Sequence, residues 1–330
     1  MWYYKIGREP IVISSRVRLA RNFKDYKFPH IMTVEETDKL LDDIKNIIDD
    51  NISLLKLKDI DNITLNSLVE RHLVSKEFIT YVNKRAVLLN NDCTLSVMVN
   101  EEDHLRIQGF SYGNNIKSAY DIAKRLEEKI GNKLEYAKHD KFGYLTACPT
   151  NTGSGIRVSV MLHLPALTKL GYMNKLLQDA ATFGIAIRGM YGENTAAQGN
   201  IYQISNQRTM GVSDQEIISN IEKVVKNIIS QEKKARNLLM QDKAEFEDKI
   251  MRALGTLKYA RKIDSREAQR NISLVRMGIE RNIITNIDID KLQKISVNIH
   301  PNMLMLELKQ EMDETLRDKE RANYIRKELE

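Results

Sequence analysis

The spacing of apolar residues changes at about Ser213, and this change limits the folds that the chain can adopt. Before Ser213, strand-like runs alternate with stretches of helical period. After it, apolar residues recur with helical period to the end of the chain, and strand signals nearly vanish. The sequence therefore predicts a mixed α and β domain followed by an all-helical domain, with the boundary near residue 225. The three clearest predicted strands are residues 11–13, 94–99 and 156–164.

Helix boundaries are marked by residues that can bond the free backbone groups at a helix end. Thr33 with Glu36, and Ser213 with Glu216, have the spacing of a capping box, in which each side chain bonds the other residue's backbone N–H. A further helix is predicted to stop at Gly131. We expect a left-handed turn there, because a residue without Cβ adopts it at little cost.

The composition argues against a membrane protein. Apolar residues make up 42% and charged residues 29% of the 330-residue chain, as in soluble globular proteins. The longest apolar runs, such as residues 158–164, are much shorter than the ~20 residues that span a bilayer, and residues 1–10 contain no signal-peptide core. We therefore expect a cytoplasmic protein that makes no contact with a membrane.

Charge and cysteine content argue against two further classes. Lys and Arg (51) barely outnumber Asp and Glu (45), and the sequence has no clustered basic arm, so direct binding to nucleic acid is not expected. Cys93 and Cys148 are the two cysteines, and neither has partners at the spacing of a disulfide framework or a zinc site. No metal bound by protein ligands is predicted.

Five arginines stand where their side chains can converge on a ligand. Arg16 and Arg18 point to the same side of an extended segment, because successive side chains alternate. The other three follow an acidic run, open an apolar strand or lie in a glycine-flanked loop: Arg106, Arg157 and Arg188. Guanidinium groups donate bidentate hydrogen bonds to phosphate oxygens, so this set favours a polyphosphate clamp. For Arg16 and Arg18 alone, a solvated strand face explains the spacing equally well.

Three acids and one thiol are candidates for chemistry. Glu101, Glu102 and Asp103 lie between a predicted strand and an arginine, although a surface acid cluster is the commoner fate of such a run. A guanidinium is a poor nucleophile, so a kinase that acts on it needs a carboxylate to orient the group and accept a proton. Cys148 is either an inert buried thiol or, beside arginines, a thiolate that pairs with a substrate guanidinium.

Familiar nucleotide-binding motifs are missing from the sequence. It contains no GxxxxGK[ST] P-loop and no glycine-rich loop with the HRD and DFG set of protein kinases. A nucleotide clamped by arginines is the remaining interpretation of the charged residues.

Four segments together resemble the catalytic domain of the phosphagen (guanidino) kinases over about residues 11–225. They are SSRVRLARN, NEEDHLR, CPTNTGSG and RGMYGENTAAQGNIYQISNQRTMG. The resemblance implies an α+β fold, in which an antiparallel sheet flanked by helices forms the catalytic domain. An all-helical C-terminal domain would follow, so that the two domains are residues 1–225 and 226–330.

Within that family the chain is most similar to the bacterial protein-arginine kinases. Only 13 residues precede Ser14, where small-molecule phosphagen kinases carry a helical N-terminal domain. The segment at 317–322 also fits the RDxxRA phosphoarginine-sensing motif of this group. Two of its arginines, Arg317 and Arg321, are spaced to lie on one helical face and grip a phosphate from two sides. The sensing residues implied are Arg317, Asp318, Lys319, Glu320, Arg321 and Ala322.

The resemblance also assigns site residues and substrates. It implies ATP with Mg²⁺ as cofactors, Glu102 as the catalytic base, Cys148 as the reactive cysteine and Arg106 as a catalytic arginine. The residues implied to hold ATP are Ser14, Ser15, Arg16, Val17, Arg18, His72, Arg106, Arg157, Val158, Ser159, Val160, Met161, Arg188, Gly189, Met190, Tyr191, Gly192 and Glu193.

The implied function is ATP-dependent phosphorylation of arginine side chains in proteins. For the cell, the resemblance implies a role in stress response and protein quality control, with modified proteins marked for a Clp-type protease and a heat-shock repressor under control. An activator protein, a Clp-type ATPase and a homo-oligomer, dimeric or larger, are the partners it implies.

Two other functions stay open. Ala196 stands where arginine-specific members have a second glutamate. The role of the catalytic carboxylate then falls to Glu102 or to a neighbour such as Glu193. This departure leaves room for a catalytically weak adaptor that binds phosphoarginine. A small-molecule guanidino kinase is the other alternative, and turnover on proteins or on free arginine separates the three.

Overall fold

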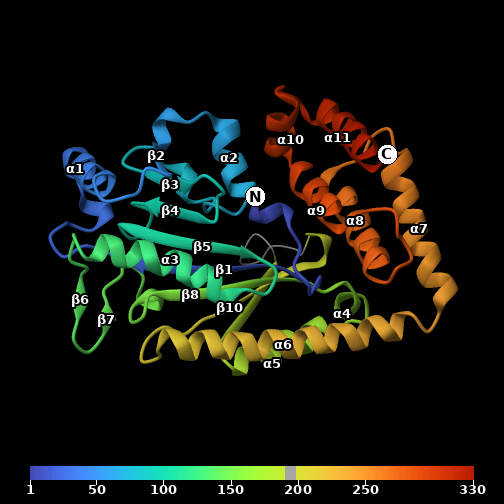
Figure 1. Ribbon diagram of the computed structural model, residues 1–330, viewed down its shortest axis with the longest axis horizontal. Helices are drawn as coiled ribbons and strands as arrows, with labels where there is room; N and C mark the ends of the chain where they lie inside the picture. Colours follow the sequence, from blue (N-terminus) through green and yellow to red (C-terminus); the bar gives the residue numbers. More distant parts are fainter. Residues whose placement is uncertain (190–197) are drawn as a thin grey trace.

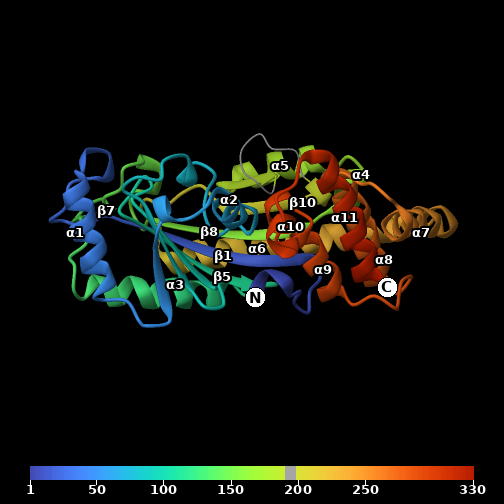
Figure 2. The ribbon, with the colours of Figure 1, turned by 90° about the horizontal axis from the view of Figure 1, so that it is seen from above.

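The computed structural model describes residues 1–189 and 198–330 and contains two units (Figure 1). The sheet unit is built on a large β-sheet flanked by helices and includes the long helix α6 (Asp214–Leu239). The helical unit follows it and contains only helices as its regular elements in residues 243–330. Figure 2 shows the helices of this unit gathered at one end of the molecule, with α1 (Val34–Lys45) at the other. The predicted α+β class with a helical C-terminal part is confirmed.

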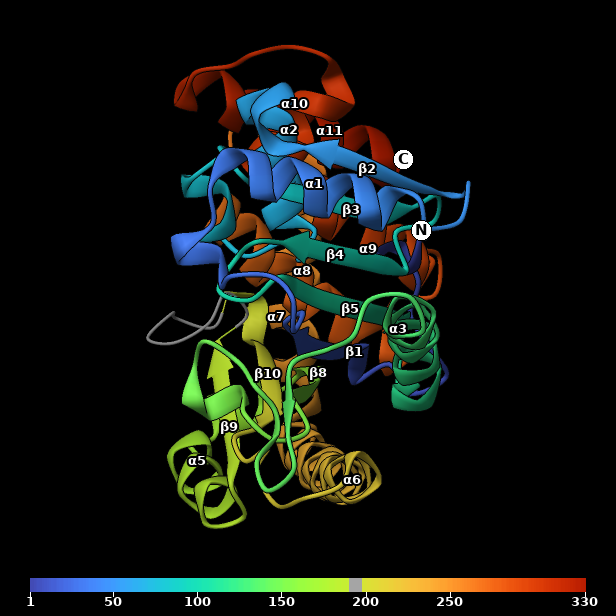
Figure 3. The same cartoon turned by 90° about the vertical axis from the view of Figure 1, so that its left-hand side faces the viewer.

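Eight strands of the described residues form one antiparallel sheet in the order β2-β3-β4-β5-β1-β8-β10-β9, which Figure 3 shows from β2 down to β9. The three predicted strands are present. The first of them extends well beyond residue 13, because the alternating segment with Arg16 and Arg18 continues it. The strands are β1 (Val12–Arg21), β2 (Ile52–Lys56), β3 (Ala86–Asn90), β4 (Leu95–Val99), β5 (Leu105–Tyr112), β8 (Ile156–His163), β9 (Ile185–Gly189) and β10 (Ile201–Asn206).

The two faces of the sheet differ in polarity because side chains alternate along each strand. Val17 and Leu19 of β1 are fully buried on the apolar face, and α3 (Ile116–Gly131) and α6 cover that face (Figure 3). Gly109 lets α3 approach, since a Cβ at this position would lie 2.0 Å from the carbonyl oxygen of Ala119. The opposite face carries the arginines, and α2 (Asn62–Glu70) covers its part over β3 to β5.

Both predicted capping boxes are confirmed, at Thr33 before α1 and at Ser213 before α6. The prediction for Gly131 is wrong in its conformation. Gly131 is the last residue of α3, the cap after it is right-handed, and Gly131 is not among the residues with positive φ. Its missing Cβ serves packing instead, because a Cβ would come within 2.7 Å of the Tyr136 ring.

The helical unit has a core of its own. Ile250, Val275, Leu292 and Leu304 belong to it, and all four are fully buried. No helix of residues 1–189 and 198–330 is long and apolar enough to cross a membrane. The helices of this unit are α7 (Lys243–Tyr259), α8 (Ser265–Glu280), α9 (Ile289–Asn298), α10 (Pro301–Leu308) and α11 (Glu314–Leu329). Two shorter helices, α4 (Pro165–Lys169) and α5 (Met173–Thr182), belong to the sheet unit, as does the hairpin of β6 (Lys138–His139) and β7 (Gly143–Tyr144).

The predicted boundary near residue 225 falls in the middle of α6. Val225 is fully buried in the core of the sheet unit, and this core includes α6 residues as far as Ala235. The core of the helical unit begins at Phe246, beyond the turn that separates α6 from α7. We therefore propose that the boundary lies in the turn at 240–242.

Several sets of contacts join the units, among them the bonds of Glu70 to the start of α10 and the two described next. The N-terminal segment packs on α9, where Tyr4 Oη donates to Asn298 Oδ1 at 2.7 Å and the backbone N–H of Ile6 donates to Asp290 Oδ1 at 2.8 Å. The second set is a buried ion cluster, in which Arg236 of α6 binds both Glu232 of the same helix and Glu280 of α8. The helical unit is therefore held firmly beside the sheet.

Candidate active site

The arginines converge because of the strand register. Residues directly opposite one another in an antiparallel pair point to the same face of the sheet. Arg18 of β1 lies opposite Arg157 of β8, and Arg16 lies opposite Ser159. By the same rule Arg106 of β5 shares this face through Ala20, and Arg188 of β9 shares it through Gln203 of β10. The predicted convergence of these side chains is present in the structure.

All five arginines line one cavity of about 760 Å³, which we call the arginine cavity. Its other walls come from the end of α2 and the residues after it, and from the helical unit. Gln108 and Gln203 complete the polar sheet face. The lining residues outside the sheet include Glu70, His72, Ser75, Ser265, His300 and Pro301.

The arginine cavity is a cluster of cations. Burial, together with the neighbouring charges of Arg106 and Arg157, lowers the pKa of Arg16 to about 10. The pKa of Arg106 is lowered to about 10 by burial and by Arg157. The buried Nε of Arg106 has no hydrogen-bond partner among the described residues. A polyanion in this cavity would relieve the mutual repulsion and accept that unused bond.

The three side chains of the acidic run, residues 101–103, have different surroundings. Glu101 binds Arg106, with 2.6 Å between Oε2 and Nη1, and accepts a hydrogen bond from Ser75 Oγ at 3.0 Å. Asp103 is buried and accepts the backbone N–H of Ala147 at 2.7 Å, which holds the segment before Cys148. Glu102 is exposed and lines a second cavity.

The second cavity, the carboxylate cavity, has a volume of about 650 Å³ and contains Glu102 and Cys148 in its lining. Glu101 also lines it, so the ion pair of Glu101 with Arg106 joins the two cavities. The pKa of Glu102 is raised, first by partial burial and then by the charge of Asp103, while Arg157 acts in the opposite direction. Glu102 is therefore a stronger base than an ordinary glutamate.

Cys148 lines the carboxylate cavity and is not in the lining of the arginine cavity. Its Sγ is 3.0 Å from Thr150 Oγ1, and Lys84 and Arg85 are the cations of the carboxylate cavity that it lines. The glycines that follow Cys148 close the loop onto its neighbours. Gly153 has a φ of +113°, and a Cβ there would lie 2.6 Å from the Thr209 carbonyl oxygen.

The remaining predicted nucleotide residues lie in different surroundings. Ser14, His72 and Met161 line a small cavity of about 50 Å³ next to the arginine cavity. Ser15 is buried and donates to the Gly113 carbonyl. The side chains of Val17, Val158 and Val160 face the apolar core, so only their strands border the site. Gly189 ends β9. Met190, Tyr191, Gly192 and Glu193 lie outside the described residues, and so does Ala196.

The sensing segment packs inside the helical unit. Arg321 is buried, and its guanidinium donates to the carbonyls of Ile299 and Ile263 and to Asp318 Oδ1. Arg317 and Arg321 therefore do not present equal exposed guanidinium groups on one face in this structure. The buried Nε of Arg317 has no hydrogen-bond partner among the described residues.

Sequence reasoning missed several lining residues. Gln108 stands two residues after Arg106, so the alternation that paired Arg16 with Arg18 applies to it as well. Gln203 of β10 lies opposite Arg188, so the same rule places its side chain on this face. Glu70, His300 and Pro301 have no local signal, because tertiary packing alone brings them to the cavity.

Comparison with known proteins gives a consistent match along the chain. The family model for the C-terminal catalytic domain of ATP:guanido phosphotransferases matches residues 33–235. The model for the C-terminal domain of protein-arginine kinase McsB matches residues 243–330. The gap between these two matches includes the turn between α6 and α7.

Relatives of similar length carry one description. A protein-arginine kinase from Clostridium acetobutylicum is 43% identical over 326 residues, which cover 97% of this chain and 96% of that protein. One from Clostridium novyi is 41% identical over 328 residues, covering 97% and 95%.

Solved structures agree on the fold. Lombricine kinase matches with a TM-score of 0.61 and 26% identity, covering 69% of this chain and 68% of that one. The duplicated taurocyamine kinase from Schistosoma mansoni, with bound components of a transition-state analogue, matches with a TM-score of 0.60 and 25% identity. This match covers 68% of this chain and 33% of that one.

Proposed function

Because the chain belongs to the protein-arginine kinases of the ATP:guanido phosphotransferase family, we propose that it transfers the γ-phosphoryl group of ATP to arginine side chains of proteins. One observation carries this proposal. A cavity lined by five arginines adjoins a cavity that contains an exposed glutamate of raised pKa, and the ion pair of Glu101 with Arg106 joins them. The first suits a phosphate donor and the second suits a cationic acceptor.

The arginine cavity fits the triphosphate of ATP. Its cations come from different strands, so they can contact oxygens on several phosphates at once, and the Arg106 Nε is still available for one of them. Mg²⁺ would partly neutralise these phosphates. In residues 1–189 and 198–330 no group of three His, Cys, Asp or Glu side chains is placed to hold a metal, so we propose that Mg²⁺ is held mainly by the nucleotide.

Glu102 acts as the base in the mechanism that we propose. Its carboxylate accepts a proton from the target guanidinium as a nitrogen of that group bonds to the γ-phosphorus, and ADP leaves with the electrons of the broken P–O bond. Glu101 holds Arg106 in place against the transferring group. Cys148, which lines the same cavity, pairs with the guanidinium. Catalysis is thus mainly positioning and charge stabilisation.

We further propose the cellular setting that the family resemblance implies. It comprises a cytoplasmic location, marking of proteins for a Clp-type protease, control of a heat-shock repressor, an activator protein and a homo-oligomer. The similarity to protein-arginine kinases over 97% of the chain supports these proposals. Co-purification from stressed cells tests them, since a protein recovered without any of these partners would contradict the assignment.

Sensing of phosphoarginine by residues 317–322 is also a proposal, and the structure narrows its test. The Asp318 carboxylate accepts from the buried Arg321 guanidinium, which also donates to the Ile263 carbonyl, so changing either side chain disturbs the fold. Arg317 has an unused buried donor and is the better target. We expect Arg317→Ala to remove any stimulation by added phosphoarginine and to leave the basal rate unchanged. Undiminished stimulation would contradict a sensing role.

The acceptor is identified by comparing substrates. The protein is incubated with ATP and either free arginine or an unfolded protein such as casein, and acid-labile phosphate is measured. We expect incorporation into casein and little into free arginine. Transfer to free arginine alone would favour the small-molecule guanidino kinase, and binding of phosphoarginine without turnover would favour the adaptor.

A further inference from the structure

The helical unit forms part of the lining of the arginine cavity. Ser265 at the start of α8, and His300 and Pro301 at the start of α10, line the arginine cavity beside the sheet. The small adjoining cavity shares His72 and His300 with it and is closed on the same side by α9. The α9 residues in its lining are Gln293, Ser296 and Val297.

The two ends of this space differ in chemistry. Arginines surround one end, whereas the other contains His72, His300, Met161 and Val297. Burial is the main cause that lowers the pKa of both histidines, so their rings are neutral at neutral pH. Neutral rings and apolar side chains suit a flat nucleobase, and the arginine end suits its phosphates.

The residues of the helical unit that line the arginine cavity, Ser265, His300 and Pro301, form what we call the wall. Glu70 connects this wall to the sheet unit. Its carboxylate accepts the backbone N–H of Asn302 at 3.0 Å and that of Met303 at 2.8 Å, and the side-chain amide of Asn302 at 2.7 Å. These are first-turn donors of α10, where a negative charge is favoured. Glu70 ends α2, two residues before His72, which is held at a φ of +60°. One carboxylate therefore fixes His72 and His300 relative to each other.

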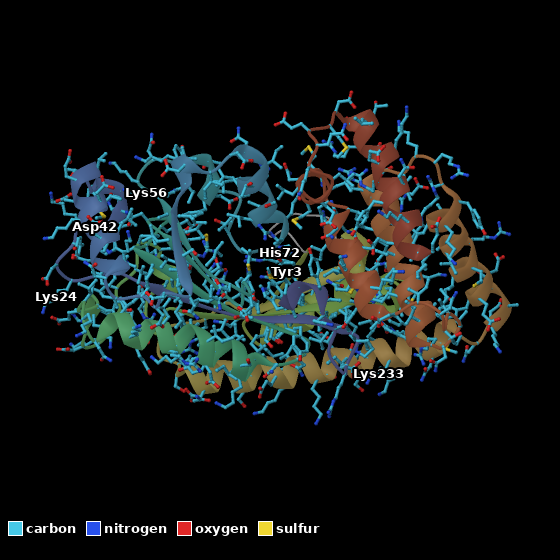
Figure 4. All side chains as sticks on the ribbon, turned by 45° about the horizontal axis from the view of Figure 1, so that its top comes forward. Tyr3, Lys24, Asp42, Lys56, His72 and Lys233 are labelled. Atoms are coloured by element: carbon cyan, nitrogen blue, oxygen red, sulfur yellow. The ribbon has the colours of Figure 1, made fainter. Side chains whose placement is uncertain are left out.

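Two more contacts hold the wall from behind. Gln293 of α9 donates to the Tyr3 carbonyl at 3.1 Å, and Arg321 of α11 donates to the Ile299 carbonyl at 2.9 Å. Figure 4 shows Tyr3 and His72 close together where the sheet meets the C-terminal helices. The wall is thus anchored to the N-terminal segment, to α2 and to α11.

We propose that His300 and Pro301, fixed by the Glu70 carboxylate on the first turn of α10, position the nucleoside part of ATP against His72. The inference rests on the proposed function, because it requires ATP in the arginine cavity. It gives the helical unit a direct part in nucleotide binding. Glu70 and His300 are positioning residues here, since the arginines and Glu102 carry the chemistry.

The test separates the nucleoside from the phosphates. Glu70→Gln and His300→Ala are compared with the parent for the KM for ATP, kcat, and calorimetric affinity for ATP and for inorganic tripolyphosphate. We expect about tenfold weaker ATP binding in both variants. Glu70→Gln weakens the hydrogen bonds that hold the start of α10, and His300→Ala removes the imidazole ring. Affinity for tripolyphosphate and kcat at saturating ATP should stay unchanged. Glu307→Gln, an exposed carboxylate on the same helix, is the matched control.

The outcomes are distinct. Unchanged ATP affinity in both folded variants overturns the proposal and leaves the arginine clamp intact. Equal losses for ATP and tripolyphosphate also overturn it, since the wall would then act only through the phosphate site. If the parent itself binds neither ligand, the proposed function fails, and this proposal fails with it because it requires ATP in the arginine cavity. Should Glu70→Gln unfold, as circular dichroism would show, His300→Ala decides alone.

Discussion

Arg106 is the side chain that connects the two cavities. It lines the arginine cavity, and its Nη1 binds Glu101 of the carboxylate cavity. We predict that Arg106→Ala weakens ATP binding and lowers turnover by a factor that corresponds to about 3 kcal/mol, because a fixed cation is removed from the phosphate clamp. Calorimetry and steady-state kinetics measure both effects. Arg125→Ala, an exposed arginine of α3, is the control and should match the parent. Equal behaviour of the two variants would remove Arg106 from the clamp.

Glu102 and Glu101 are neighbours of the same residue type with different expected roles. We predict that Glu102→Gln binds ATP normally but turns over ~10²-fold more slowly, because it cannot accept the proton. Glu101→Gln should weaken ATP binding instead, through the loss of its ion pair with Arg106. Near-normal turnover of Glu102→Gln would assign the base to another carboxylate.

The raised pKa of Glu102 also predicts the pH dependence of the rate. The carboxylate must be deprotonated to act as a base, so kcat should fall as the pH drops through its pKa. This acidic limb should lie above the ~4.3 of an ordinary glutamate. A limb at or below the ordinary value would contradict the environment described for Glu102.

The sequence predicts a site residue where the alternation of side chains along a strand determines which sheet face the residue occupies. Arg16, Arg18 and Arg106 share one face because of strand register, and the sequence contains that information. His300 reaches the cavity from the far end of the chain, and only the packing of α10 against α2 places it there. No spacing in the sequence encodes such a contact.

Among the elements, β1 and α3 are joined by a buried ion pair. Arg21 Nε lies 2.9 Å from Glu127 Oε1, and Lys124 and Tyr144 bind the same carboxylate. We predict that Glu127→Ala costs about 3–5 kcal/mol in the free energy of unfolding, because the Arg21 charge is left buried without its partner. Urea denaturation measures this cost. Glu128→Ala, exposed on the same helix, should change stability little.

The pKa of Glu127 gives the sign of a pH effect on stability. Burial raises this pKa, but Arg21 and Lys124 outweigh burial, and the pKa is lowered overall. A depressed pKa contributes stability above the unfolded-state value and loses it as the pH falls through the folded-state value. The difference in stability between the parent and Glu127→Ala should therefore shrink in acid. A difference that stays constant with pH would contradict an ionised Glu127.

Helix ends were predicted where a side chain bonds the local backbone, as at Thr33 and Ser213. The left-handed turn predicted at Gly131 is wrong because the glycine is required for another reason. The Tyr136 ring, which follows the helix in sequence, packs where a Cβ would lie. The predicted boundary near residue 225 lies within one continuous helix. α6 continues past it, and the side chains that determine where the core of the sheet unit ends come from both halves of the helix.

For the whole molecule, Arg236 is a buried charged link between the two units. It is buried and binds Glu232 of α6, Glu280 of α8 and the His163 carbonyl of β8. We predict that the parent unfolds in one calorimetric transition, and that Arg236→Ala lowers the Tm and separates the unfolding of the units, because two buried carboxylates lose their cation. Lys234→Ala, exposed on the same helix, is the control. A single unchanged transition in Arg236→Ala would show that the link is dispensable.

In the proposed reaction, ATP held in the arginine cavity delivers a phosphoryl group to an arginine guanidinium in the neighbouring carboxylate cavity. Its most direct test uses two peptides that differ only by Arg→Lys at one position, ATP labelled in the γ-phosphate, and mass spectrometry to locate the label. We predict label on the arginine of the first peptide, none on the second, and loss of the label in acid. Label on lysine or on a hydroxyl side chain, or no label on either peptide, would contradict it.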